Sequence, residues 1–86
     1  MSTLLLTRAD IAALLTPADY LAAVETAFRL SKQGLAPSPQ PMHIAGVDGG
    51  FHAKGAALMG DRRLCALKLN GNFPGNPARG LPTIQG

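Results

Sequence analysis

The sequence lacks tryptophan and has only one tyrosine, three phenylalanines and one cysteine. With so few large aromatic side chains, a chain of 86 residues can bury only a modest core, and small cores often depend on a partner or a second domain. Cys65 alone permits neither an internal disulfide nor a zinc site built from cysteines. It has no activating neighbour in the sequence pattern, so we expect it to be structural.

The sequence also lacks both a cluster of like charges and a long apolar run. Eight basic and five acidic residues give a net charge of +3, and the basic residues are scattered along the chain. Nucleic-acid-binding proteins usually gather basic residues on one face, so no nucleic-acid partner is expected. No apolar run approaches the ~20 residues that span a bilayer, and the first ten residues do not resemble a signal peptide. These absences predict a cytoplasmic protein with no membrane partner.

Two helices are predicted from a repeated start signal, a threonine followed three residues later by an aspartate. The signal occurs at Thr7 and again at Thr16, where Pro17 also occupies the first helical position. The predicted helices cover residues 8–15 and 17–33. The second helix carries an apolar stripe that is expected to pack on a core, formed by Tyr20, Leu21, Val24, Ala27, Phe28 and Leu30.

The rest of the sequence predicts a sheet. Strands are expected at residues 3–6, 42–45, 51–58 and 64–72, with an Asp-Gly turn near Asp48 and a Pro- and Gly-rich loop over residues 73–86. The expected fold class is α+β, with an N-terminal strand and two helices packed on an antiparallel meander.

Alternation along the predicted strands places basic and polar side chains together within individual strands. Lys68 shares its face with Asn70, while His52 and Lys54 share a face of the preceding strand and His43 lies on that strand's hairpin partner. Lys68, Lys54 and His43, together with His52, are therefore candidate residues for binding an anion. Alternatively, these residues lie on an exposed face or edge of the sheet and bind no ligand, since lysine at an edge strand discourages pairing with another strand. The histidine spacing matches no metal site, and no metal is expected.

The most specific part of the sequence is the run from Lys68 to Pro77, KLNGNFPGNP, followed by GLPTIQG at residues 80–86. These two segments together resemble the signature motif of the ornithine cyclodeaminase/mu-crystallin family. The order of the upstream segments also agrees, so the resemblance covers essentially the whole chain.

Members of this family are NAD(P)-dependent enzymes that act on small amino or imino acids. The resemblance implies that residues 1–86 are an N-terminal substrate-binding and dimerisation domain, which forms a homodimer and precedes a Rossmann domain that is absent here. No catalytic or cofactor-binding residue is expected within the chain, so alone it should be inactive. The alternative is a stand-alone, dimerising module that binds small anions without catalysis.

The resemblance also assigns expected roles to three residues. Lys68 matches the family lysine that contacts the substrate carboxylate. His43 stands where the family usually has an arginine, and a neutral imidazole cannot replace a bidentate guanidinium. Lys54 stands in a Lys-Gly pair where the family often has Met-Pro, and it could supply a second cation in compensation.

Overall fold

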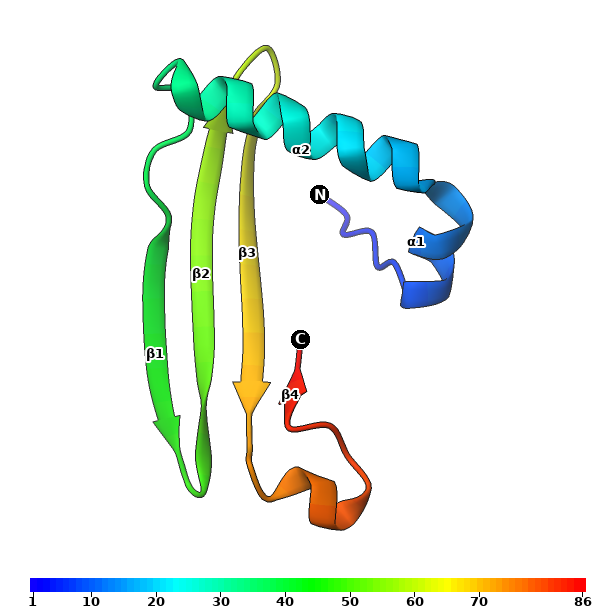
Figure 1. Cartoon of the computed structure of the whole chain (residues 1–86), viewed down its shortest axis with the longest axis vertical. Coiled ribbons are helices and arrows are strands. Elements are labelled where there is room, and N and C mark those ends of the chain that lie inside the picture. Colours follow the sequence, from blue (N-terminus) through cyan, green and yellow to red (C-terminus); the bar gives the residue numbers. More distant parts are fainter.

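The protein is described by a computed structural model that covers residues 1–86. Two helices precede an antiparallel sheet whose strands follow one another in chain order (Figure 1). The elements are α1 Arg8–Leu14, α2 Pro17–Lys32, β1 Gln40–Gly46, β2 Gly49–Met59, β3 Arg63–Asn72, the 3-10 helix η1 Asn76–Arg79 and β4 Ile84–Gln85.

Both α-helices begin at the capping boxes that the sequence predicts. The Thr7 hydroxyl accepts a hydrogen bond from the Asp10 amide at 3.2 Å, and the Asp10 carboxylate accepts one from the Thr7 amide at 2.8 Å. Thr16 and Asp19 repeat the arrangement at 3.3 and 2.7 Å. Because each carboxylate accepts a backbone hydrogen bond from its threonine, the pKa of Asp10 and of Asp19 is lowered.

The sheet is held by a long antiparallel ladder between β1, β2 and β3. In the β1–β2 hairpin, Gly46 pairs with Gly49, and Asp48 in the turn has a positive φ of 60°. Aspartate tolerates this left-handed conformation better than most residues, which favours it at a tight turn. The register pairs His43 with His52 and Lys54 with Lys68. The same-face assignments drawn from the sequence are therefore confirmed.

Three expectations are corrected by the structure. Residues 3–6 form no strand, because no other strand lies beside them to complete a ladder. The predicted loop over residues 73–86 contains η1 and also β4, which pairs with the end of β3. The helices do not pack on the sheet as a layer: α2 contacts only β2, and α1 contacts no other element.

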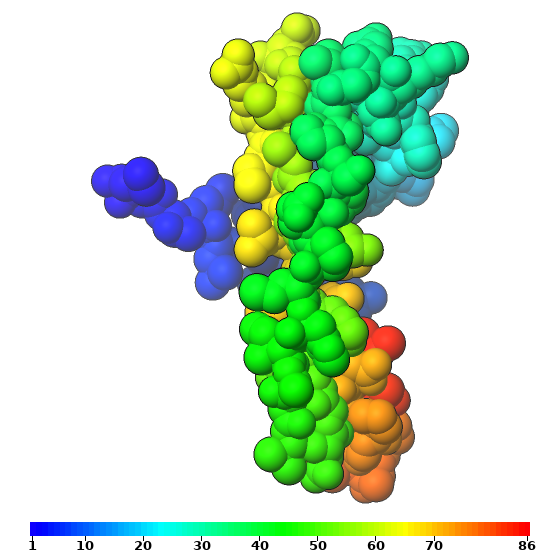
Figure 2. All heavy atoms as spheres, turned by 90° about the vertical axis from the view of Figure 1, so that its left-hand side faces the viewer, coloured from blue at the N-terminus to red at the C-terminus, as the bar shows by residue number.

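The molecule has very little core. Its accessible surface is 7483 Å², whereas a compact monomer of 8.9 kDa would expose about 4,800 Å². Its radius of gyration is 16.1 Å, against about 12 Å for a compact domain of this length. Figure 2 shows the N-terminal segment projecting from the body of the molecule. Much apolar surface therefore lies open in the isolated chain.

The apolar stripe of α2 is part of this open surface. Phe28 is 73% exposed and Leu21 is 70% exposed, so the expected burial of the stripe is wrong for the chain alone. Only the C-terminal end of α2 approaches the sheet, where Leu30 lies beside Gly60 at the turn between β2 and β3. The helix is amphipathic, but residues 1–86 contain no second surface large enough to cover its apolar side.

No single helix is both long enough and apolar enough to cross a membrane. Taken together, α1 and α2 meet the requirements of length and composition, but the two helices meet at 90°.

Candidate functional site

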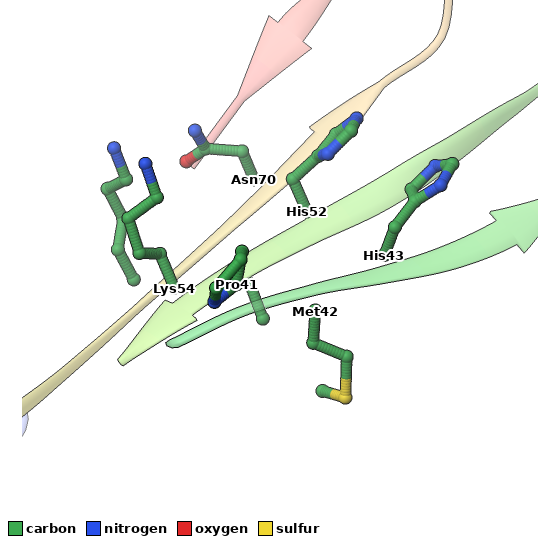
Figure 3. A pocket seen from close by; sticks show the side chains of 8 residues that line it. Pro41, Met42, His43, His52, Lys54 and Asn70 are labelled. Carbon is green, nitrogen blue, oxygen red and sulfur yellow. The ribbon is translucent and has the colours of Figure 1, made fainter. Parts of the chain in front are cut away.

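One hollow on the sheet collects the candidate anion-binding residues. It has a volume of about 520 Å³, within the range of small-molecule sites. The polar and basic residues that the register places on this face, called the cationic face below, are His43, His52, Lys54, Lys68 and Asn70. Figure 3 shows Lys54, His52 and Asn70 projecting to one side of the strands, with Met42 pointing to the other. The structure thus brings all the predicted site residues together.

Lys54 and Lys68 form the electrostatic centre of this hollow. They are directly opposite each other on β2 and β3, so their side chains leave the sheet as cross-strand neighbours. Neither lysine has an ion-pair partner, because the single ion pair of the chain joins Arg29 to Glu25 on α2. No acidic residue lines the hollow. Two like charges in this position repel each other, and an anion placed between them would relieve that repulsion.

The two histidines flank the lysines towards the β1–β2 turn. The rings of His43 and His52 are stacked, with centroids 4.4 Å apart and planes inclined by 11°. Nowhere in the chain do three or more histidine, cysteine or acidic side chains lie close enough together to hold a metal ion, so these two rings have no third metal ligand beside them. Their ring nitrogens can instead donate or accept hydrogen bonds at the wall of the hollow.

His52, which the sequence already offered for the anion site, is joined in the hollow by Asn70, which was not proposed as a binding residue. His52 and Asn70 face each other across β2 and β3 beside the lysine pair. Alternation along each strand already placed them on the same face as a lysine, so the signal was present in the sequence. What the sequence did not show is that the hollow extends over them, because its extent depends on side-chain packing.

The segment after β3 is organised by Asn76, which sequence reasoning did not single out. The residue is 6% exposed, its side-chain amide donates to the Pro82 carbonyl at 3.1 Å, and its side-chain oxygen accepts from Arg79 at 2.7 Å. The Leu81 amide donates to its backbone carbonyl at 3.1 Å, just after Gly80 with φ 75°. Asparagine commonly braces turns in this way. Part of the Pro-Gly-Asn motif is therefore explained by loop structure.

Replacing Asn76 with alanine is expected to lower the free energy of unfolding by about 1–3 kcal/mol, because the Pro82 carbonyl and the Arg79 guanidinium lose their partner. Urea unfolding of the complete protein measures this loss. Gln33→Ala is the matched control, since that exposed amide makes no side-chain hydrogen bond, and it should change stability by less than about 0.5 kcal/mol. Equal effects of the two substitutions would show that Asn76 does not brace the loop.

The structure has an α+β fold with a basic hollow on an antiparallel sheet, and this arrangement can hold a small anion. The chain is 38% identical over 85 residues to an alanine dehydrogenase of Archaeoglobus fulgidus. The alignment covers 99% of this chain and 26% of that protein, so the chain spans about a quarter of the relative's length. No family model and no solved structure matches the chain. The chain is thus similar, along nearly its whole length, to one part of an amino-acid dehydrogenase.

The residues of this chain do not fit a dinucleotide. Its one glycine-rich run, at residues 46–50, closes the β1–β2 hairpin and leads into a strand. A dinucleotide site of the Rossmann type instead needs a glycine turn between a strand and the N-terminus of a helix. Residues 1–86 therefore provide no such cradle.

Proposed function

We propose that this chain is the substrate-binding part of an NAD(P)-dependent oxidoreductase of the ornithine cyclodeaminase/mu-crystallin family that acts on a small amino or imino acid. The observation that carries the proposal is the pair Lys54 and Lys68, opposed in a hollow without acidic residues. Similarity to an alanine dehydrogenase supports the same class of substrate. The nicotinamide cofactor would be held by residues outside this segment.

In this proposal, Lys68 binds the substrate carboxylate and orients it. An ammonium group donates short, charge-assisted hydrogen bonds to carboxylate oxygens, and its position in the middle of β3 fixes where those oxygens lie. Lys54 supplies the neighbouring positive charge from β2. His43 bounds the hollow on β1 through its stacked ring, and its imidazole can contribute a hydrogen bond but not the bidentate contact of the arginine expected from the family.

Replacing Lys68 with methionine keeps a long, unbranched side chain and removes its charge. In the complete protein, this change is expected to weaken binding of small amino acids such as alanine or proline by about 10- to 100-fold, the effect of losing one charge-assisted hydrogen bond. Isothermal titration calorimetry measures the affinities. Lys32→Met, on the exposed end of α2, is the control and should leave them unchanged. Unaltered affinity in Lys68→Met would refute the role of this lysine.

We also propose that the protein is a homodimer joined through the apolar face of the sheet. This face is opposite the cationic face and carries Met42, Ile44, Phe51, Leu67 and Leu69. The chain exposes roughly 2,700 Å² more than a compact monomer of its mass, and a stable homodimer buries about 2,000 Å² or more. A single apolar patch can pack against its own copy about a two-fold axis.

A binding module without catalysis is the second candidate, favoured by one observation. Every residue that lines the hollow lies between Pro41 and Asn70, so the anion site needs no other segment to be formed. Such a module should bind simple anions such as phosphate or acetate as tightly as amino acids. Competition calorimetry against alanine separates the two candidates, since the dehydrogenase proposal requires the amino acid to bind more tightly.

A further inference from the structure

The cationic hollow has more positive charge than one carboxylate can balance. Lys54 and Lys68 both line it, and none of the five acidic residues of the chain does. A ligand with one carboxylate neutralises one ammonium group and leaves the other uncompensated beside it. The remaining charge would then favour a second negative group on the same ligand.

We infer that the natural ligand of this hollow is a small amino or imino acid with a second carboxylate on its side chain. The inference rests on the proposed function and names the substrate class within it. Lys68 binds the carboxylate next to the nitrogen-bearing carbon, and Lys54 binds the side-chain carboxylate. No covalent step is involved, since both lysines act only by binding.

The strand geometry suits two separate carboxylates. Directly opposed residues on antiparallel strands have Cβ atoms about 4.5–5.5 Å apart. Their ammonium groups stand at the ends of flexible stems and repel each other, so they can separate to contact two different groups of one ligand. A short dicarboxylic acid offers two such groups, whereas a single carboxylate offers both lysines the same one. Each carboxylate can then receive its own ammonium group.

The other lining residues can hold the middle of such a ligand. Asn70 and His52 face each other two pairs along the ladder from the lysines, which makes them the next pair on the same face, so they border the same hollow without adding an acidic group. The Asn70 side chain offers both an acceptor and two donors, and it takes part in none of the side-chain hydrogen bonds of the chain. Its carbonyl oxygen can accept from an amino or imino nitrogen while the lysines hold the two ends.

Glutamate and glutamine provide a test of the second carboxylate, because they have nearly the same size and differ in side-chain charge. Titration calorimetry of the complete protein should show glutamate binding about tenfold or more tightly than glutamine, as expected for one additional charge-assisted contact. Raising the salt concentration should reduce this preference, since both lysines are exposed.

Variants at the two lysines then assign the two contacts. Lys54→Met should abolish the preference for glutamate over glutamine, because it removes the charge that binds the second carboxylate, whereas Lys54→Arg should retain the preference because it retains the charge. Lys68→Met should weaken both ligands. Lys32→Met, far from the hollow on α2, should alter neither. Circular dichroism of each variant confirms that the fold is retained.

Three results would overturn the inference. If glutamate and glutamine bind equally and both depend on Lys68, the second carboxylate is wrong and the proposed function stands. If neither binds to the wild-type protein, both the proposed function and the inference fail. If inorganic phosphate displaces glutamate at comparable concentration, the lysine pair selects for anionic charge alone and not for a dicarboxylic acid.

Discussion

Replacing Leu67 with glutamate is expected to dissociate the proposed homodimer into monomers. Leu67 lies on the apolar face of β3 and is 77% exposed in the isolated chain. In the proposed homodimer it would be buried twice, once from each copy, so the substitution would bring two unpaired carboxylates into one interface. Burying unpaired charge costs several kcal/mol, and the dissociation constant should rise by about 100-fold or more.

Sedimentation equilibrium over a range of protein concentrations measures this shift. Val47→Glu is the matched control, because Val47 is 86% exposed at the hairpin turn and lies outside the ladder of paired residues. That variant should remain dimeric. A wild-type protein that is monomeric at micromolar concentration would show that another part of the same polypeptide covers the apolar face. A Leu67→Glu variant that remains dimeric would place the interface elsewhere.

The elements that the sequence predicts correctly are those set by local chemistry. Thr7 and Thr16 start their helices because each side chain and its aspartate satisfy amide groups three residues away, an interaction that needs no tertiary partner. Alternation places Lys54 with His52 on one face of β2 and Lys68 with Asn70 on one face of β3, and the register of the ladder makes these the same face of the sheet. The candidate site could therefore be found from sequence, since its members lie on adjacent strands of simple hairpins.

The predictions that failed depend on distant surfaces. A leucine-rich segment such as residues 3–6 becomes a strand only where a neighbouring strand offers hydrogen bonds, and sequence pattern does not reveal that neighbour. The stripe of α2 predicts that the helix has a buried side, but it does not identify what buries it. Asn76 was missed for a related reason, because its bonds to Pro82 and Arg79 depend on the path of the whole loop.

The second large effect is expected at Gly49, the first residue of β2. A β-carbon built at this position would overlap the Asn72 carbonyl oxygen and would come within 2.5 Å of the Phe73 ring. The Phe73 ring cannot simply move away, because it packs edge-on against Phe51, with ring centroids 5.3 Å apart. The backbone of Phe73 is also held, since its amide donates to the Thr83 carbonyl at 2.8 Å. Gly49→Ala should therefore lower the free energy of unfolding by about 2–3 kcal/mol.

Gly75→Ala is the control for this substitution. Its position has φ −78° and no atom within 4 Å of the added methyl group, so stability should stay within about 0.5 kcal/mol of wild type. Urea unfolding of both variants in the complete protein gives the comparison. If Gly49→Ala is as stable as Gly75→Ala, Phe73 does not pack against this end of the sheet.

A double-mutant cycle separates the two contacts at Gly49. If the ring causes most of the loss, Gly49→Ala should cost much less in a Phe73→Ala background, because the methyl group then occupies space that the ring has left. If the Asn72 carbonyl causes it, the cost should remain, since the ladder between β2 and β3 is unchanged by truncating Phe73. The first outcome would identify the Phe73–glycine contact as the link that fixes the loop of Asn76 to the strands that carry Lys54 and Lys68.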